Sequence, residues 1–487
     1  MGHAFCRSQA GRVARPDAME PLAENEHTRQ YRERRPLLCA YGARIRPTAV
    51  IPARPPACEA RETKETPTSS KADSMFMVRI YGPMRSANGY AIRDFLHRCD
   101  IPFEWIELRS DKEAEELAHV QHLSDSRLPV CVFRDGTRLE CPTIRQITEK
   151  LGWFASPSRE AYDLAIYGAG PAGLSAAVYG ASEGLHTVLV ERWALGGQAG
   201  SSSKIENYLG FPQGVSGAEL AERARVQAIK FGAEILLARA GVHAEFPPGR
   251  GIVYLEDGTR ITARTSICAT GVAYRTLGLV GEERYLGAGL YYGAGASEAE
   301  LIHGEDVYVV GGGNSAGQAA MHFSQSANRV YMLVRDASLK NTLSQYLVDR
   351  ITSAPNIDVR TCTEVTALAG SDALQEITLT DVRTCRQSTV RANWLFVCIG
   401  GVPQTEWAKE VGIVRDEGGY LVTGPDLQEY RANLNWPLER APLHLETCVP
   451  GVFAAGDVRH ASIKRVASAV GEGAMAVALV HRYLNSA

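Results

Sequence analysis

The feature that most constrains the fold is a glycine-rich turn that occurs twice, each time between an apolar strand and a helix. The first turn follows the apolar segment 162–167 and reads Gly168-Ala169-Gly170-Pro171-Ala172-Gly173. In such a turn Gly168 permits the tight bend, Gly170 lets the backbone approach a pyrophosphate, and Gly173 allows the helix to pack closely on the strand. The phosphates would bind at the helix N-terminus, where free N–H groups favour an anion.

The residues around this first fingerprint support a dinucleotide site. The next predicted strand, 187–190, ends in Glu191, whose carboxylate can accept hydrogen bonds from ribose hydroxyls. Two further apolar strands end in polar motifs, Thr270-Gly271 and Gly456-Asp457. An ordinary turn or a helix cap is the alternative for Asp457.

The second fingerprint follows the apolar segment 307–310 and reads Gly311-Gly312-Gly313-Asn314-Ser315-Ala316. Its spacing is Gly-x-Gly-x-x-Ala. The next strand ends in Arg335 rather than in an acid, and Lys340 lies five residues further on. A cation there can pair with the 2′-phosphate of NADPH, so the pattern favours NADPH over NADH. The neighbouring Asp336 weakens this argument, and both cations could be solvated surface charges.

The segment 78–151 has a different pattern. Its predicted elements follow the order βαβαββα, with Pro129 at the start of the third strand and an Asp135-Gly136 hairpin turn. This order resembles a thioredoxin or glutaredoxin domain, a family with a cis proline at this place and a redox Cys-x-x-Cys after the first strand. Here the equivalent stretch 84–89 contains no cysteine. The resemblance therefore implies docking or scaffolding rather than dithiol chemistry.

Residues 162–484 resemble the low-molecular-weight thioredoxin reductases. The resemblance rests on the two fingerprints, Gly196-Gly197-Gln198, the stretch 205–212 with Asn207, and Gly456-Asp457. It implies FAD and NADPH as cofactors, Gln198 and Asn207 beside the flavin, Asp457 on the ribityl chain, and a homodimer whose domains swivel. The expected architecture is α/β, with two Rossmann-like three-layer ββα domains after a small thioredoxin-like domain. The expected boundaries are 1–74 (disordered arm), 75–154 (thioredoxin-like), 160–285 with 401–487 (FAD), and 286–400 (NADPH).

The sequence departs from that family where its redox dithiol should lie. The two cysteine positions fall on Gly293 and Ala296, and no two cysteines in the chain have the Cys-x-x-Cys spacing. Glycine and alanine can neither attack a disulfide nor resolve a mixed disulfide. Tyr291 and Tyr292 lie at the same place and could cover the flavin, shape an acceptor pocket, or simply pack. Lys464 and Arg465 could balance a reduced flavin or be exposed helix charges.

These observations favour an NADPH-dependent FAD oxidoreductase whose small-molecule or protein acceptor is not reached through an internal dithiol. One alternative is a thioredoxin-disulfide reductase that uses other cysteines, such as Cys268 and Cys398, or cysteines of a partner. Another is a non-enzymatic flavin redox sensor that binds a partner through the thioredoxin-like domain. The acceptor itself and the purpose of the first 74 residues stay open.

Composition excludes several other classes. The formal net charge is −3 over 487 residues, which gives no reason to expect nucleic acid or a membrane surface as a partner. No stretch approaches the roughly 18–20 apolar residues that span a bilayer, and no signal pattern opens the chain, so we expect a cytoplasmic protein. The eleven cysteines are irregularly spaced, which argues against a disulfide framework or a metal site.

Overall fold

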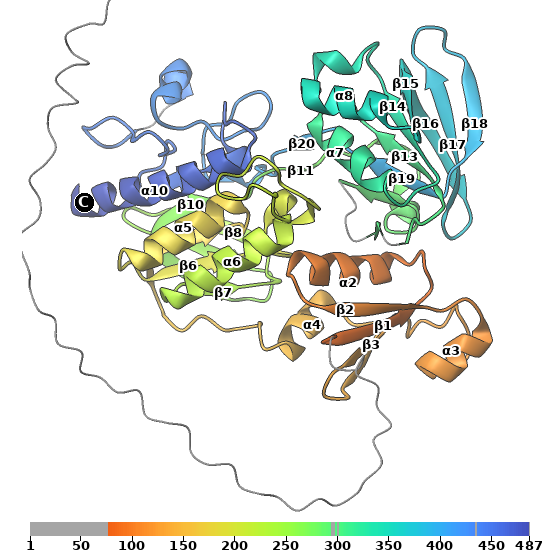
Figure 1. Ribbon diagram of the computed structural model, residues 1–487. Coiled ribbons are helices and arrows are strands. Elements are labelled where there is room, and N and C mark those ends of the chain that lie inside the picture. Colours follow the sequence, from red (N-terminus) through yellow and green to blue (C-terminus); the bar gives the residue numbers. More distant parts are fainter. Residues whose placement is uncertain (1–75, 294–297, 300, 434–435, 487) are drawn as a thin grey trace, which may run out of the picture. The chain divides into compact units, whose positions relative to one another are not determined.

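The computed structural model describes residues 76–293, 298–299, 301–433 and 436–486 (Figure 1). The expected disordered arm, 1–74, and Ala296 lie outside the described residues. The described residues form five sheets, and the three largest have helices packed on them. The expected α/β class, with two dinucleotide-binding folds of parallel strands, is confirmed.

The N-terminal module, which we define as residues 78–150, is a four-stranded sheet with three helices. Its strand order is β2-β1-β3-β4, with β1 parallel to β2 and antiparallel to β3. Its elements have these bounds: β1 Val78–Gly82, α2 Ala87–Arg98, β2 Phe103–Glu107, α3 Asp111–Ala118, β3 Val130–Phe133, β4 Arg138–Glu140 and α4 Ile144–Lys150. The predicted order βαβαββα is confirmed, and the Leu128–Pro129 peptide bond is cis.

The apolar pattern of the sequence predicts a helix over 91–99, and helix α2 begins four residues earlier, at Ala87. The Ser86 side chain accepts a hydrogen bond from the backbone N–H of Gly89 and caps the helix from position 87. A serine in this position satisfies one of the donors that every helix N-terminus leaves free. The helix therefore begins within the stretch 84–89, where the thioredoxin family carries its dithiol.

The first Rossmann-type sheet carries the first glycine fingerprint. Its strand order is β7-β6-β5-β10-β9-β8, and β21 pairs with β10 in parallel. The bounds are β5 Tyr162–Tyr167, β6 Thr187–Val190, β7 Glu234–Leu236, β8 Gly241–Glu245, β9 Gly251–Leu255, β10 Arg260–Cys268 and β21 Val452–Ala454. Helices α5 (Pro171–Ser182), α6 (Gly217–Lys230) and α10 (Val466–Ser486) pack side by side, as Figure 1 shows. The C-terminal segment thus completes a sheet begun far earlier in the chain.

The second Rossmann-type sheet carries the second fingerprint and is wholly parallel, in the order β12-β19-β13-β14-β15. The bounds are β12 Leu290–Tyr292, β13 Asp306–Val310, β14 Arg329–Val334, β15 Ile357–Thr361 and β19 Trp394–Val397. Helices α7 (Asn314–Phe323) and α8 (Gln345–Ser353) lie on it, and β16 Thr363–Gly370, β17 Leu374–Asp381 and β18 Gln387–Arg391 form a separate antiparallel sheet. Buried strands such as β19 are apolar throughout, as expected of a sheet covered on both faces.

Short elements connect the two Rossmann-type sheets. Strands β11 (Ala273–Tyr274) and β20 (Gly401–Val402) pair antiparallel where the chain passes from one sheet to the other. The remaining elements are α9 Trp407–Glu410 and the 3₁₀ helices η2 Gly197–Ser201, η3 Glu282–Tyr285, η5 Leu339–Asn341, η6 Gly424–Asn433 and η7 Gly456–Val458. None of the helices in the described part of the chain has the length and apolarity to cross a bilayer.

Candidate functional site

In the first fingerprint the close packing of the backbone requires glycine at positions 168 and 173, whereas Gly170 faces open space. Gly168 has a φ of +105°, and a Cβ there would lie 2.4 Å from the carbonyl oxygen of Ala269. A Cβ on Gly173 would lie 1.8 Å from the carbonyl oxygen of Gly168. A Cβ on Gly170 would meet only the Gly197 Cα, at 3.9 Å. The space beside Gly170, at the N-terminus of α5, therefore suits a pyrophosphate.

The sequence predicts a helix over 174–182 after the first fingerprint, and helix α5 begins three residues earlier, at Pro171. Proline suits the first helical position because its missing N–H would have no partner there. Pro171 and Ala172 therefore belong to the helix, and the N-terminal N–H groups of α5 follow directly after Gly170.

Glu191 lies immediately after β6, where the sequence places a ribose acceptor. Its carboxylate is buried and accepts hydrogen bonds from the backbone N–H groups of Ala169, at 2.7 Å, and Trp193, at 2.9 Å. These donors compensate the buried charge, and each carboxylate oxygen keeps further acceptor capacity. A hydrogen bond thus joins Glu191, the candidate ribose acceptor, directly to the first fingerprint.

The Gly-Gly-Gln loop, defined as residues 196–201, lies against the first fingerprint. Gly196 and Gly197 have φ values of +81° and +53°, and a Cβ on Gly197 would lie 3.1 Å from the Gly170 Cα. The Gln198 side chain donates to the backbone oxygen of Val272 at 2.9 Å. This bond ties the loop to the segment that follows Thr270 and Gly271. Three sequence motifs therefore lie next to one another, at 168–173, 196–198 and 270–271.

The Gly-Asp motif reaches the same place from the C-terminal part of the chain. A Cβ on Gly456 would lie 2.9 Å from the Ala172 Cβ, and the Gly456 N–H donates to Glu472 at 2.7 Å. Asp457 is partly buried, and burial raises the pKa of its carboxyl group. Within the described residues no hydrogen bond is donated to that carboxylate. It is therefore available to a ligand hydroxyl.

The sequence also singles out Lys464, Arg465 and Asn207, and each of them has different contacts. The Lys464 ammonium donates to the backbone oxygen of Asp457 at 2.7 Å and to Ser462, so it holds the loop that carries the Gly-Asp motif. Arg465 donates to the backbone oxygen of Lys464. Asn207 is exposed on the loop after Ile205 and makes no side-chain hydrogen bond to any described residue. Among the described residues, Asn207 and Gln198 are not joined by a hydrogen bond.

The second fingerprint repeats the geometry of the first. Gly311 has a φ of +138°, and a Cβ there would lie 2.3 Å from the carbonyl oxygen of Cys398. A Cβ on Gly313 would meet nothing within 4 Å. Ala316 is fully buried, the Asn314 side chain accepts from the Ser344 N–H at 2.8 Å, and Ser315 is exposed at the start of α7. This N-terminus therefore also suits a dinucleotide phosphate.

The side chains of Arg335 and Lys340 are exposed. Both residues follow β14, a strand of the sheet that carries the second fingerprint. Neither side chain forms an ion pair with a described residue. Their charges are thus available for a 2′-phosphate, in agreement with the preference for NADPH.

Reversing both charges, in an Arg335→Glu/Lys340→Glu variant, is expected to raise the KM for NADPH by about 10- to 100-fold and to change the KM for NADH by less than about threefold. A hydrogen bond to a charged group contributes about 1.5–3 kcal/mol, which corresponds to that factor. Steady-state kinetics with both nucleotides measures the effect. Arg329→Glu, at the opposite end of β14, is the control, and equal losses for NADH and NADPH would contradict the assignment.

The position of the missing first thiol is occupied by backbone in a left-handed conformation. Gly293 has a φ of +98°, and a Cβ there would lie 2.5 Å from the Cζ and hydroxyl oxygen of Tyr274. The Tyr274 hydroxyl shares a 3.0 Å hydrogen bond with Ser201 of the Gly-Gly-Gln loop, and burial raises its pKa. The sequence contains no motif that marks Tyr274 as part of this site.

Tyr291 and Tyr292 turn out to be packing residues. Tyr291 is fully buried, its ring stacks on Phe396 at 5.0 Å, and its hydroxyl donates to the Gly287 backbone oxygen at 3.2 Å. Tyr292 donates to Glu282 at 3.0 Å. Of the uses considered for them, ordinary packing is therefore the one that their contacts support. The Tyr291 ring lies inside the core of the second Rossmann-type sheet.

Cys268 and Cys398, the cysteines that the sequence offers as an alternative, are not suited to disulfide exchange. All eight are free thiols. Burial raises the pKa of Cys268 and of Cys398 to about 12. Because the thiolate is the nucleophile in disulfide exchange, such thiols are unreactive near neutral pH. No group of residues suited to a metal ion occurs in the described part of the chain.

Comparison with known proteins gives consistent matches over the two Rossmann-type folds. The family model for pyridine nucleotide-disulphide oxidoreductases matches residues 162–473. A thioredoxin reductase of Treponema pallidum is 32% identical over 326 residues, which are 67% of this chain and 98% of that protein. The F component of the alkyl hydroperoxide reductase from Staphylococcus aureus (strain Mu50) is 30% identical over 346 residues, which are 70% of this chain and 64% of that protein.

Solved structures agree with these relatives. The chain resembles the thioredoxin reductase of Lactococcus lactis in its FR conformation with a TM-score of 0.60 and 27% identity, over 67% of this chain and 100% of that one. It resembles the thioredoxin reductase of T. acidophilum with a TM-score of 0.59 and 29% identity, over 67% of this chain and 99% of that one. The N-terminal module precedes the residues that the family model matches.

Proposed function

The chain belongs to the pyridine nucleotide-disulphide oxidoreductase family, and we propose that it passes electrons from NADPH through FAD to an acceptor that is not reached through an internal dithiol. The family of thioredoxin reductases uses FAD and NADPH. The reductive half of the reaction is therefore that of a flavoprotein oxidoreductase. The proposal concerns the oxidative half, in which electrons leave the flavin.

The observation that carries the proposal is the geometry at Gly293. A cysteine there would need a backbone conformation that side chains rarely adopt, and its Cβ would overlap the Tyr274 ring. Cys268 and Cys398, the other candidate thiols, are buried with raised pKa values. A dithiol relay thus has neither its residues nor the space for the first of them.

The residues fit the cofactors that the family uses. Bound FAD supplies the chemistry of accepting a hydride from NADPH and releasing electrons to an acceptor. We assign Gly170 and the N-terminus of α5 to its pyrophosphate, Glu191 to the ribose of its adenosine, Gln198 to the flavin and Asp457 to the ribityl chain. The fit rests on the open space at Gly170 and on the Asp457 carboxylate, which receives no hydrogen bond from described residues.

We assign the nicotinamide nucleotide to the second fingerprint, with Gly313 and the N-terminus of α7 at its pyrophosphate and Arg335 and Lys340 at its 2′-phosphate. The acceptor is a small molecule or a protein, and the working form is a cytoplasmic homodimer. The thioredoxin reductases among its relatives support an electron-accepting partner of this kind.

Rapid mixing of the FAD-loaded chain with NADPH tests the first half of the proposal. The flavin absorbance near 450 nm, a wavelength set by the flavin itself, should disappear within a single turnover. Steady-state NADPH oxidation with oxygen, a quinone, ferredoxin and thioredoxin then identifies the class of acceptor. Turnover with thioredoxin alone would overturn the proposal, and slow turnover with all four would indicate a redox sensor.

Replacing the eight described cysteines with alanine or serine is expected to leave NADPH oxidation with the preferred acceptor within about twofold of the wild type. The reason is that hydride transfer between nicotinamide and flavin uses no thiol. Steady-state rates at saturating FAD measure it, with circular dichroism to check folding. Because several of these thiols are buried, a Cys268→Ala/Cys398→Ala variant provides the milder test. Loss of a thioredoxin-dependent rate in a folded variant would instead favour the disulfide reductase.

A further inference from the structure

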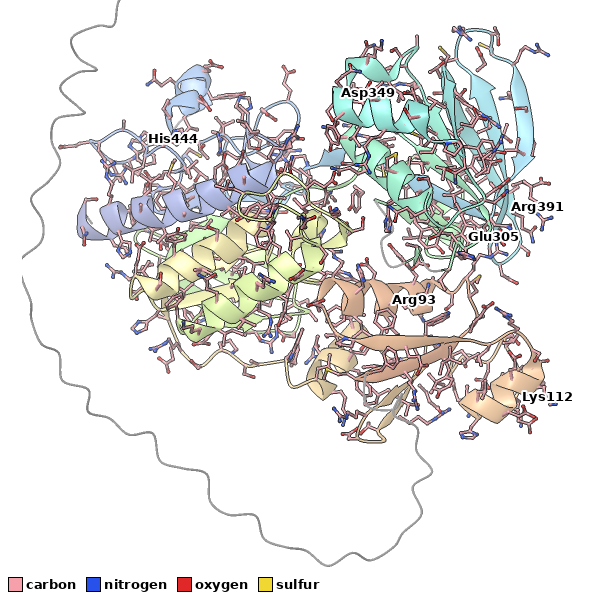
Figure 2. The ribbon with its side chains drawn as sticks, viewed as in Figure 1. Arg93, Lys112, Glu305, Asp349, Arg391 and His444 are labelled. Carbon is pink, nitrogen blue, oxygen red and sulfur yellow. The ribbon has the colours of Figure 1, made fainter. Side chains whose placement is uncertain are left out.

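Helix α2 belongs to the N-terminal module but contacts both Rossmann-type folds. Near its middle, Arg93 forms a 2.9 Å ion pair with Glu298, and the Tyr90 ring lies 5.0 Å from that of Tyr291 (Figure 2 labels Arg93 on α2). Its last turns contact α6 and η2 of the first fold. The helix that would carry a dithiol in the thioredoxin family is therefore used here as a contact surface.

Arg98, the last residue of α2, reaches the Gly-Gly-Gln loop. Its Nη2 donates a hydrogen bond to the backbone oxygen of Gly197. Its Nε lies 3.6 Å from the point where a Cβ on Gly200 would stand. The side chain is only 16% exposed, and its Nη1 lies 3.4 Å from Asp94, one turn earlier on the same helix face. The guanidinium group is thus held by its own helix and hydrogen-bonds to the loop at Gly197.

The loop needs such support because of its own backbone. Gly196 and Gly197 are consecutive left-handed residues, and glycine loses more conformational freedom on ordering than any other residue. On one side Gly197 packs close to Gly170, the fingerprint glycine assigned to the pyrophosphate. The Gly197 carbonyl oxygen accepts the hydrogen bond from the Arg98 guanidinium group. A cation from another part of the chain therefore orders the residue next to the phosphate site.

Asp94 makes a second connection from the same helix face. Its carboxylate accepts a 3.4 Å hydrogen bond from the Trp193 indole N–H. The backbone N–H of Trp193 in turn donates to Glu191, the ribose acid, at 2.9 Å. One face of α2 thus contacts both the Gly-Gly-Gln loop and the segment after β6 that contains Glu191 and Trp193.

We propose that Arg98 is a positioning residue for the flavin, and that the N-terminal module through it forms part of the FAD site. The inference rests on the proposed assignment of Gly170, Gly197 and Gln198 to FAD. Arg98 acts through the Gly197 carbonyl group and holds the Gly-Gly-Gln loop in the conformation that receives the cofactor. This role gives the N-terminal module a function that needs no dithiol.

The test compares Arg98→Met, Arg98→Lys and the control Arg109→Met in the full chain. Arg109 lies in the same module, with its side chain 72% exposed and paired only at the surface with Glu107. We expect Arg98→Met to weaken FAD binding roughly tenfold or more and to shift the flavin absorption spectrum and reduction potential at saturating FAD. Arg98→Lys should recover part of each effect, and Arg109→Met should match the wild type.

A purely structural role would lower the melting temperature of Arg98→Met but leave the spectrum and potential of its FAD-loaded form unchanged, and that result would overturn the inference. If Arg98→Met does not fold, hydrogen exchange on the wild-type chain tests the inference instead. Added FAD should protect the amides of residues 94–99 together with those of 196–201, and protection of the loop alone would overturn the inference. If the wild type itself binds no FAD, the proposed function fails instead.

Discussion

Gly173→Ala is expected to abolish FAD binding and to lower the free energy of unfolding by more than about 3 kcal/mol. The new Cβ would lie 1.8 Å from the Gly168 carbonyl oxygen, far inside van der Waals contact. Neither partner can move freely, because Gly168 itself packs against the backbone of Ala269. The start of α5 must therefore shift away from β5, and the pyrophosphate site opens. Chemical denaturation and FAD titration measure the two effects.

Gly170→Ala is the matched control within the same fingerprint. Its Cβ would meet only the Gly197 Cα at 3.9 Å, and its φ of −73° is accessible to alanine. Stability should stay within about 1 kcal/mol of the wild type, the cost of alanine at a helix N-cap. FAD affinity should nevertheless fall, because the methyl group enters the space assigned to the pyrophosphate. Wild-type FAD affinity in Gly170→Ala would refute that assignment.

Arg93→Met is expected to lower the free energy of unfolding by about 3–5 kcal/mol, the usual cost of removing one partner of a buried ion pair. Arg93 and Glu298 have side chains exposed by only 1% and 0%, and their contact is 2.9 Å long. The guanidinium also lies 4.1 Å from the centre of the Trp105 ring. The substitution removes the charge that faces Glu298 and the cation on the indole, while methionine keeps most of the apolar stem. Urea denaturation of the full chain measures the loss.

Two further variants make this prediction specific. Arg93→Met/Glu298→Met should recover much of the lost stability, because apolar replacement of a whole buried pair is often neutral. Arg145→Met removes an ion pair with Glu149 that is 50% and 47% exposed, and should cost less than about 0.5 kcal/mol. A loss below about 1 kcal/mol in Arg93→Met would show that this contact does not hold α2 in place.

The local parts of the fold follow from the sequence with few errors. Strands 162–167 and 187–190 have the predicted bounds, because short buried strands of a parallel sheet are mostly apolar. The sequence predicts helix starts at residues 91, 174 and 317, whereas the helices begin earlier, at Ala87, Pro171 and Asn314. The apolar period of a helix begins inside its first turn, while its true start depends on a cap such as Ser86 or on the fingerprint glycine.

The site was predictable where its residues belong to strand–turn–helix motifs. The two fingerprints, Glu191 and Asp457 could be named because each follows a strand directly, and parallel strands bring their carboxyl ends to one edge of a sheet. Tyr274 and Arg98 could not be named, since neither lies in a motif. Their importance arises from contacts with Gly293, Ser201 and Gly197, which lie far from them in the chain. The same long-range packing, with Phe396, places Tyr291 in the core.

The sequence alone determined that this chain has two dinucleotide folds of the reductase type and that Gly293 and Ala296 replace their dithiol. Glycine spacing and strand periodicity are local properties, so the residue order carries them completely. Only the tertiary structure decided that Tyr274 lies against Gly293 and that α2 of the N-terminal module contacts both folds. Those contacts depend on which surfaces bury one another, and no local pattern encodes that choice.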